Sequence, residues 1–237
     1  MRAVILAAGE GRRLRPLTEH APKPMLAVAG KPLLERNVSL LARYGFTDIV
    51  INTHYRARSI EDHFGDGSAF GVRVRYSREA ELLGTAGALN PLRDLLTGTF
   101  LVLYGDILTN CNLRGLLEVH RTKSATITLA VFRRENATAA GIVAIDSGDR
   151  VERFLEKPQP DEVFSSWVNA GIMVCEPRVF DAIPPGFSDF GRNVLPELIR
   201  RGDRVFAYRM DGENERLLWI DSPEDYERTK AAVRQWI

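Results

Sequence analysis

The sequence predicts an α/β fold in which a mostly parallel sheet is flanked by helices. Apolar, strand-like runs alternate with helix-like segments through the first half of the chain, as in parallel strands joined by crossover helices. A glycine-rich loop follows the first of these runs, and Asp106 follows a later one. Because α/β sheets bind ligands at the carboxyl ends of their strands, both features mark the expected site.

The first half of the chain contains four predicted strands and three predicted helices. The strands are expected at 3–7, 48–53, 72–76 and 100–104, and the helices at 32–44, 59–64 and 86–96. Pro32 suits a first helical position and Gly45 suits a helix terminus, so the first crossover helix has both ends marked.

The second half is richer in strands, which are expected at 125–132, 141–145, 151–155 and 167–175. Ser222 and Pro223 look like the cap and first turn of a final helix that ends near Trp236. No linker rich in glycine, serine or proline separates the halves. We therefore expect a single two-lobed domain over 1–237, with halves of about 1–108 and 109–237.

Composition excludes several classes of protein. The 237 residues include 32 basic and 31 acidic side chains without a basic tract, so nucleic-acid binding is not indicated. Cys111 and Cys175 are too few and too far apart for a disulfide framework or a zinc site. No apolar run approaches the roughly 18 residues of a membrane span. A cytoplasmic protein without a membrane partner is expected, and surface or capping roles are expected for the four histidines.

The loop after the first strand is suited to holding a polyphosphate. Residues 6–26 read LAAGEGRRLRPLTEHAPKPML, in which Gly9 and Gly11 allow close backbone approach and several cations can clamp phosphate oxygens. Leu14 occupies the third glycine position of a dinucleotide-binding motif, and no P-loop motif is present. A solvated, arginine-rich turn is the alternative, but three prolines stiffen this loop as functional loops are stiffened.

The same run resembles the signature of the sugar-nucleotide pyrophosphorylases, the nucleoside triphosphate:sugar-1-phosphate nucleotidyltransferases. Later blocks of that family match in the same order: GTAG at 84–87, GD at 105–106, EKP at 156–158, NAG at 169–171 and WID at 219–221. The block ELLGTAGAL at 81–89 is most similar to the mannose-1-phosphate guanylyltransferase branch.

The resemblance implies a Rossmann-like nucleotide-diphospho-sugar transferase fold and a Mg²⁺-dependent enzyme. Such an enzyme condenses a nucleoside triphosphate with a sugar 1-phosphate to give an NDP-sugar and pyrophosphate. GTP and a mannose- or heptose-type sugar are the first choice, with glucose-1-phosphate thymidylyl-, uridylyl- or cytidylyltransferases as alternatives. A non-catalytic regulatory paralogue that binds sugar nucleotide is a rival of another class, and a homo-oligomer is compatible with the resemblance.

The resemblance also implies the roles of individual residues. Arg13 and Lys23 are expected to be catalytic, acting on the α-phosphate and the departing pyrophosphate. The nucleotide, held by the 1–108 half, is expected to contact Leu6, Ala8, Gly9, Gly11, Arg13, Lys23, Glu81, Gly84 and Thr85. The sugar phosphate, held by the 109–237 half, is expected to contact Gly141, Glu156, Lys157 and Asn169.

Asp106 and Asp221 are the expected Mg²⁺ ligands. Mg²⁺ commonly takes one or two protein carboxylates and fills its remaining positions with phosphate oxygens and water. The family commonly continues with Asp-x-Gly-Thr-Pro, whereas Asp221 is followed directly by Ser222 and Pro223, so two residues are missing. Asp221 therefore has an alternative role as part of the cap of the final helix.

Overall fold

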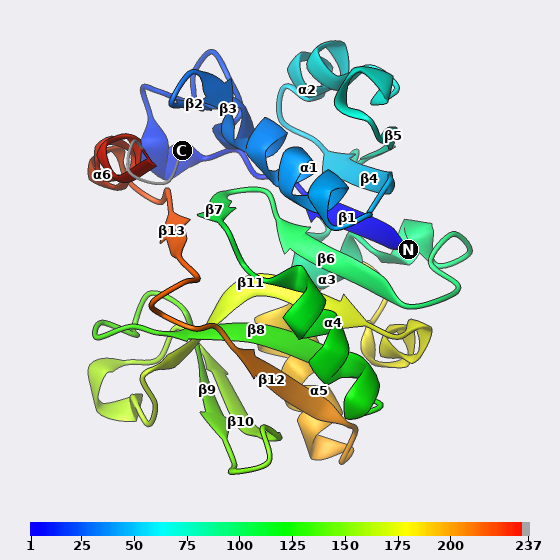
Figure 1. The fold of residues 1–237 in the computed structure, drawn as a ribbon, viewed down its shortest axis with the longest axis vertical. Helices are drawn as coiled ribbons and strands as arrows, with labels where there is room; N and C mark the ends of the chain where they lie inside the picture. Colours follow the sequence, from blue (N-terminus) through cyan, green and yellow to red (C-terminus); the bar gives the residue numbers. More distant parts are fainter. Residues whose placement is uncertain (234–237) are drawn as a thin grey trace. The chain divides into compact units, whose positions relative to one another are not determined.

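The computed structural model describes residues 1–233 and divides into two compact units that alternate along the chain (Figure 1). The first unit contains Met1–Leu82, Leu103–Asn110 and the chain from Leu217 onward. The second unit contains Leu83–Val102 and Cys111–Arg216. Strand β6 (Phe100–Tyr104) runs from the second unit into the first.

The first unit is built on parallel strands. Its elements are β1 (Arg2–Leu6), β2 (Ala27–Val28), β3 (Lys31–Pro32), α1 (Leu33–Arg43), β4 (Asp48–Thr53), α2 (Ala57–Phe64), β5 (Arg73–Arg78), β7 (Ile107–Thr109), β13 (Leu217–Trp219) and α6 (Pro223–Val233), with 3₁₀ turns at Arg12–Leu14, Lys23–Met25 and Ser68–Phe70. Strand β4 pairs in parallel with both β1 and β5. β1 and β4 are almost wholly buried, as strands covered on both faces must be.

The second unit carries a mixed sheet. Its elements are α3 (Gly84–Gly87), α4 (Leu113–Thr122), β8 (Ile127–Arg133), β9 (Gly141–Ile145), β10 (Val151–Glu156), β11 (Trp167–Cys175), α5 (Leu195–Arg200) and β12 (Val205–Arg209), with 3₁₀ turns at Asn90–Leu92, Pro160–Glu162 and Pro177–Ala182 and a π-helix, η7, at Phe190–Val194. The strand order is β10-β9-β11-β8-β12, antiparallel except for the parallel pair β8 and β12. In Figure 1, α4 lies in front of β8 and β12, and α5 lies behind them.

These arrangements confirm the predicted α/β class, a mixed, mostly parallel sheet flanked by helices. The predicted helix over 86–96 is wrong in its extent. A short helix ends at Gly87 and a separate 3₁₀ turn begins at Asn90, because Pro91 supplies no N–H for a continuous helical ladder. The predicted end of the last helix near Trp236 lies outside the described residues.

His120 is a second correction, because it is neither at the surface nor a cap. Its ring is 2% exposed, and its nitrogens lie 2.9 Å from Thr128 Oγ1 and 3.1 Å from Glu176 Oε1. Burial lowers the pKa of His120 even though Glu176 opposes that shift, so the ring favours its neutral form near pH 7. This buried ring ties α4 to its own sheet.

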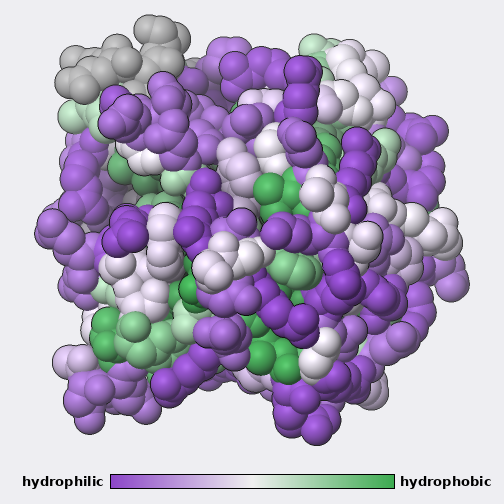
Figure 2. Space-filling view, turned by 60° about the horizontal axis from the view of Figure 1, so that its bottom comes forward, coloured by the Kyte–Doolittle hydropathy of each residue, from purple (hydrophilic) through white to green (hydrophobic). Residues whose placement is uncertain are grey.

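The surface is mainly hydrophilic on the face shown in Figure 2, where hydrophobic residues are visible only in limited areas. The large apolar side chains that stand out into solvent are scattered along the chain: Met1, Leu17, Leu82, Val163 and Phe187. Among the described residues, none of the helices has the length and apolar character needed to cross a bilayer.

Candidate active site

The loop after β1 has two glycines in different surroundings. Gly11 has a φ of +63°, and a Cβ on it would lie 2.9 Å from Lys23 Cβ, so both its backbone and its packing require glycine. The hydroxyl of Thr18 closes the loop by donating to Gly11 O over 2.8 Å. At Gly9, by contrast, none of the described atoms lies within 4 Å of the Cβ position. Gly9 is therefore the loop glycine that leaves room for an outside molecule.

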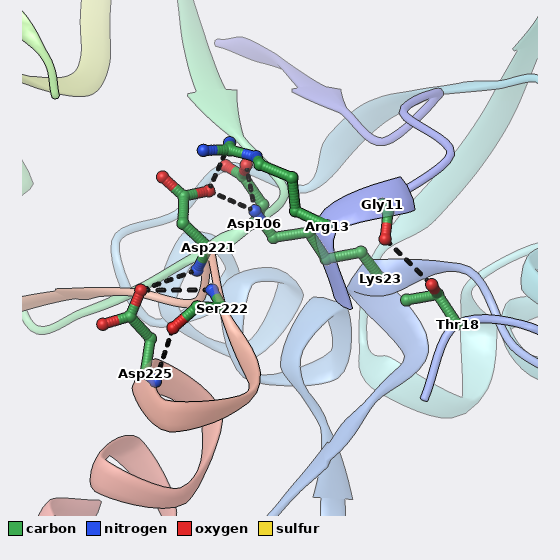
Figure 3. A network of polar contacts seen from close by, with 8 residues as sticks. All are labelled: Gly11, Arg13, Thr18, Lys23, Asp106, Asp221, Ser222 and Asp225. Carbon is green, nitrogen blue, oxygen red and sulfur yellow. Dashed lines mark hydrogen bonds and ion pairs between the residues drawn. The ribbon is translucent and has the colours of Figure 1, made fainter. Parts of the chain in front are cut away.

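Four charged residues from distant parts of the sequence meet beside this loop (Figure 3). Lys23 Nζ lies 2.7 Å from Asp106 Oδ2 and 2.9 Å from Asp221 Oδ1, so one ammonium bridges both carboxylates. Arg13 Nη2 lies 3.1 Å from the same oxygen of Asp221. The Lys23 side chain is 9% exposed, whereas that of Arg13 is 69% exposed. Lys23 is thus fixed within the cluster, and Arg13 lies at its rim.

Strand pairing explains why the two aspartates converge. Asp106 immediately precedes β7, and Asp221 is separated from the end of β13 by Ile220 alone. β7 and β13 are antiparallel with Trp219 opposite Ile107, so continuing the register places Asp106 opposite Ile220. Gly105 N also donates to Leu6 O over 2.8 Å, which places Asp106 beside the start of the glycine loop. Two short segments therefore deliver both carboxylates to one point.

The cap of α6 is made by residues other than the Asp221 side chain. Ser222 Oγ accepts from Asp225 N at 3.1 Å, and Asp225 Oδ2 accepts from the backbone N–H groups of Asp221 and Ser222, each at 3.2 Å. This reciprocal arrangement is a capping box. Asp221 therefore belongs to the cap through its N–H, and its carboxylate is directed at Lys23 and Arg13, as Figure 3 shows.

An apolar cluster anchors the charged residues in place. Leu14, Leu26, Leu108 and Ile220 each follow or precede a charged site residue closely in sequence, and all four pack into one buried cluster with Val28, Leu33 and Val233. Burying such side chains contributes about 1.5–3 kcal/mol each. This apolar cluster therefore fixes the positions of the charged residues Arg13, Lys23, Asp106 and Asp221.

Electrostatics within the cluster favour a charged Lys23. Burial by itself would lower the pKa of Lys23, but the carboxylates of Asp106 and Asp221 together outweigh this effect and hold that pKa above its ordinary value. The Lys23 ammonium donates to both carboxylates and stays charged at neutral pH, so it is a fixed positive charge that can attract phosphate oxygens.

The carboxyl ends of β4 and β5 carry a buried polar chain. Asn52 Oδ1 accepts from Ala7 N at 2.6 Å, and Asn52 Nδ2 donates to Glu79 Oε1 at 2.6 Å. Glu79 is 7% exposed, whereas Glu81, the expected guanine-binding residue, is exposed. The chain fixes the turn from Leu6 into the glycine loop by securing the backbone of Ala7.

In the second unit, three neighbouring strands bring the expected sugar-phosphate residues together. Glu156 pairs with Gly141 between β10 and β9, and Val168 pairs with Ile142 between β11 and β9. Continuing the second register places Asn169 opposite Gly141. Lys157, whose φ is +51°, follows β10, and its N–H donates to Ala140 O over 3.2 Å. All four residues therefore share one end of this sheet.

The Glu156 carboxylate is enclosed by glycines. A Cβ on Gly141 would lie 2.7 Å from Glu156 Oε2, and a Cβ on Gly191 would lie 2.4 Å from it. Burial raises the pKa of Glu156, assisted by Asp189, although Lys157 and Arg192 oppose the shift. This carboxyl group is held partly desolvated, as a group that reads substrate hydroxyls would be.

A bulge in β11 sets the position of Asn169. The pairing register with β8 shifts between Asn169 and Met173, and Gly171 has a φ of +73°. Asn169 Oδ1 accepts from Gly171 N at 3.1 Å, so the amide oxygen is committed to the bulge. Bulges commonly redirect a side chain beside a site.

The turn Gly84–Gly87 packs against a segment of its own unit. A Cβ on Gly84 would lie 2.5 Å from Ser188 O, and one on Gly87 would lie 2.3 Å from Gly186 O. Thr85 donates its N–H and its hydroxyl to Asp189 Oδ1, each at 3.1 Å, and its hydroxyl accepts from Phe190 N at 2.9 Å. Both glycines are therefore required by internal packing, and nucleotide contact by Gly84 and Thr85 stays a prediction.

The chain is similar to known proteins along almost its whole length. The profile described as Nucleotidyl transferase matches residues 2–235. The chain belongs to the nucleotidyl transferase family. The glycine loop, the paired aspartates and the partly buried Glu156 carboxylate are therefore features of a nucleotidyl transferase chain.

Two curated relatives in this nucleotidyl transferase group differ in their named substrates. A mannose-1-phosphate guanylyltransferase of Mycobacterium tuberculosis is 39% identical over 234 residues, covering 97% of this chain and 63% of the relative. A UTP–glucose-1-phosphate uridylyltransferase of Synechocystis is 37% identical over 236 residues, covering 93% of this chain and 60% of the relative. The chain thus spans about three fifths of the length of these relatives.

A solved structure supports the fold. A Bacillus anthracis crystal structure, assigned as a glucose-1-phosphate thymidylyltransferase and holding sucrose, aligns with a TM-score of 0.89 at 24% identity. The alignment covers 99% of this chain and 95% of that chain. The predicted nucleotidyl transferase fold is therefore confirmed.

Sequence reasoning missed three polar residues of this nucleotidyl transferase chain: Asn52, Glu79 and Asp189. Asn52 and Glu79 lie at strand ends next to predicted features, and a polar residue at the end of an apolar strand is the signal that could have identified them. Asp189 lies 104 residues from its partner Thr85, and nothing local in the sequence marks that contact.

Proposed function

We propose that this chain is a sugar-1-phosphate nucleotidyltransferase. In the proposed reaction a phosphate oxygen of the sugar 1-phosphate attacks the α-phosphorus of a nucleoside triphosphate, the bond to the β-phosphate bridging oxygen breaks, and pyrophosphate leaves. The products are an NDP-sugar and pyrophosphate. Both substrates are anions, so the protein must neutralise charge and hold the reacting oxygens in line.

One observation carries this proposal more than any other. Lys23 Nζ lies within hydrogen-bond distance of both Asp106 and Asp221, beside a glycine loop with open space at Gly9. One cluster thus contains two cations, Lys23 and Arg13, that can bind phosphate oxygens, and two carboxylates that can bind a divalent ion. Phosphoryl-type transfer needs that combination.

The two aspartates fit Mg²⁺ by their chemistry and spacing. Both carboxylates already contact a single cationic atom, so one cation can reach both. Two carboxylates suit Mg²⁺, which completes its shell with phosphate oxygens and water. When bound, Mg²⁺ would supply Lewis-acid stabilisation of the phosphate charge. We assign Asp106 and Asp221 as its protein ligands.

Lys23 and Arg13 have complementary tasks in this proposal. Buried Lys23 is a fixed point charge for the α-phosphate region, while the exposed guanidinium of Arg13 can follow the departing pyrophosphate. Leu6, Ala8, Gly9 and Gly11 supply backbone around the triphosphate. The second unit would hold the sugar 1-phosphate. Lys157 would bind its phosphate, and Glu156 and Asn169 would bind its hydroxyls. Gly141 would provide the space that the Glu156 carboxylate occupies.

GTP and a mannose- or heptose-type 1-phosphate remain the first-choice substrates. The relative from Mycobacterium tuberculosis, named for mannose 1-phosphate and guanylyl transfer, supports this choice at 39% identity. The relative from Synechocystis, named for UTP and glucose 1-phosphate, supports the uridylyl alternative almost equally at 37%. A cytoplasmic location is part of the proposal, since buried Cys111 and Cys175 form no disulfide.

The direct test is a matrix of GTP, dTTP, UTP, CTP and ATP against a panel of sugar 1-phosphates, read by pyrophosphate release. We expect the strongest signal for GTP with a mannose-type sugar. Product identity is checked by mass spectrometry of the NDP-sugar. Silence in every combination, with tight binding of a sugar nucleotide, would favour the regulatory paralogue over the enzyme.

Metal binding can be measured separately from turnover. Mn²⁺ replaces Mg²⁺ in many such sites, and its free fraction is measured by electron paramagnetic resonance. Asp106→Asn should weaken Mn²⁺ binding. Lys23→Met should tighten it by about 3- to 10-fold, because the ammonium and the metal compete for the same carboxylate oxygens. The exposed Asp62→Asn is the matched control and should leave Mn²⁺ binding unchanged.

A further inference from the structure

In the second unit, a set of hydrogen bonds with no role in the proposed reaction joins two segments of the chain. Asp189 Oδ1 accepts both the N–H and the hydroxyl of Thr85 at 3.1 Å, and the Thr85 hydroxyl accepts from Phe190 N at 2.9 Å. Leu83 O accepts from Ser188 N at 2.9 Å, and Ser188 O accepts from the N–H groups of Ala86 and Gly87. We call this set of contacts between Leu83–Gly87 and Ser188–Phe190 the clasp.

The clasp is partly buried and closely packed. Ser188 is fully buried, and Gly84 has no room for a Cβ beside Ser188 O. Asp189 N is itself held by Asn193 Oδ1 at 2.8 Å, so the aspartate is fixed from both its side chain and its backbone. The clasp therefore has one geometry, and removing the Asp189 carboxyl would leave two Thr85 donors without their acceptor.

The segment that follows the clasp leads directly to Glu156, one of the residues proposed to bind the sugar phosphate. Asp189 is followed by the π-helix η7, and Gly191 in it lies against the Glu156 carboxylate, where a Cβ would come within 2.4 Å of Oε2. Such π-helical turns are often found at functional sites. With Gly141 on the other side, the position of Gly191 sets the space that the carboxylate occupies.

We propose that Asp189 is a positioning residue that, through Thr85 and Gly191, fixes the Glu156 carboxylate for sugar 1-phosphate. The proposal rests on the proposed function for the identity of the substrate, and it concerns a residue that contacts no reacting atom. The turn at Gly84–Gly87, which the sequence assigns to the nucleotide, is thereby physically continuous with the pocket assigned to the sugar.

The kinetic test compares two substitutions of the same aspartate. Asn retains an oxygen that can accept from both Thr85 donors, whereas Ala removes it. Asp189→Ala should raise the KM for the sugar 1-phosphate by about 10-fold or more, because displacements near 1 Å in a binding site can cost up to about 100-fold. Asp189→Asn should stay within about 3-fold of the wild type, and Asp94→Ala, an exposed aspartate of the same unit, is the control.

A double-mutant cycle identifies the pathway. Thr85→Val should reproduce the sugar KM defect, and adding Asp189→Ala to it should add little, since both changes break one contact. Equal KM defects for nucleotide and sugar in Asp189→Ala, or Asp189→Asn and Asp189→Ala proteins that behave identically, would overturn the proposal in favour of a general structural or purely electrostatic role.

Hydrogen exchange measures the same coupling without turnover. Peptides covering 190–191 and 154–157 should exchange faster in Asp189→Ala than in Asp189→Asn or the wild type. Unchanged exchange over 154–157 in Asp189→Ala would overturn the coupling. If the wild type turns over no nucleotide and sugar pair, the proposed function fails while this measurement still decides whether the clasp positions Glu156.

Discussion

The two charged regions of the molecule are built in opposite ways. In the first unit, Lys23 and Arg13 meet Asp106 and Asp221, so each charge is balanced by a partner of the other sign. In the second unit, the Glu156 carboxyl lies against Gly141 and Gly191 and is partly removed from solvent, which raises its pKa. Opposite charges determine the geometry of the first region. In the second region, two glycines without side chains provide the space for the carboxylate.

This difference predicts how each region responds to change. Removing one member of a balanced charge cluster leaves its partners uncompensated, and the cost to electrostatic catalysis is large. Changing a residue in a glycine-walled pocket alters fit and protonation, so its effects concern one substrate and depend on pH. The following experiments would separate these two kinds of site.

The largest effect is expected for Asp106→Asn in the first unit. Turnover should fall by about 10²- to 10³-fold, the scale for losing one preorganised electrostatic contact. Folding should be nearly unchanged because the Asp106 side chain is 38% exposed. Steady-state kcat at saturating Mg²⁺ and circular dichroism measure the two properties, with Asp62→Asn as control. Full Mg²⁺-dependent activity in a folded Asp106→Asn protein would refute the assignment.

A pair of lysine substitutions compares the units directly. Lys23→Ala should impair use of the nucleotide, whereas Lys157→Ala should raise the KM for the sugar 1-phosphate by about 10- to 100-fold, the scale of one charge-assisted hydrogen bond. Varying each substrate in turn gives the two KM values, and thermal unfolding checks that Lys23→Ala remains folded. Identical defects toward one substrate would contradict the division into nucleotide and sugar regions.

The protonation of Glu156 gives a pH-dependent test of stability. Burial raises its folded pKa above the ordinary 4.5, so the folded state keeps a proton that the unfolded chain has released. The contribution of Glu156 to wild-type stability should therefore fall as pH rises from about 4.5 through the folded pKa, and then level off. Glu156→Gln lacks this loss.

The Glu156→Gln protein should equal the wild type in stability near pH 4 and exceed it by on the order of 1 kcal/mol near pH 8. It should also bind sugar 1-phosphate more weakly. Urea unfolding at the two pH values measures the difference. A constant difference across pH would mean that the carboxyl does not titrate in this range and that its environment is less desolvated than the glycine walls imply.

The sequence predicted the long apolar strands well, but it did not predict α4, α5 or β12, and it predicted long-range contacts poorly. Strands β4, β6, β9 and β11 match the predicted ranges of 48–53, 100–104, 141–145 and 167–175, because continuous apolar runs define buried strands. The helix over 86–96 failed where Pro91 interrupts it. The spacing of apolar residues and the residues that form turns are local properties of the sequence, so they predict strands and turns but not distant contacts.

The candidate site shows the same division. Asp106 could be placed at a strand end from its apolar neighbours, but its meeting with Asp221 followed from the family resemblance rather than from the chain's own pattern. In the structure that meeting depends on the register between β7 and β13, two strands of three residues each. Such short strands leave little signal in a sequence, and the contact between Thr85 and Asp189 leaves none.

The smallest effect is expected at Glu81, the exposed carboxylate assigned to the base. A carboxylate can accept from two guanine N–H donors, so Glu81→Gln should reduce the preference for GTP over UTP more than it reduces total activity. Because Glu81 is exposed, water replaces part of each lost contact, and the preference should narrow by only about 0.5–1.5 kcal/mol. The ratio of kcat/KM for GTP and UTP measures this change.

Glu79 provides the matched comparison, since it lies two residues away but is 7% exposed and accepts from Asn52 Nδ2. Glu79→Ala removes the acceptor of Asn52 Nδ2 in the buried chain that holds Ala7 N, so it should lower activity with every nucleotide alike and lower the melting temperature. If Glu79→Ala instead changes the ratio for GTP and UTP while Glu81→Gln does not, base recognition belongs to the buried carboxylate. A wild-type preference for a pyrimidine triphosphate would remove the guanylyl assignment and leave the phosphate and metal assignments intact, because those depend only on the cluster around Lys23.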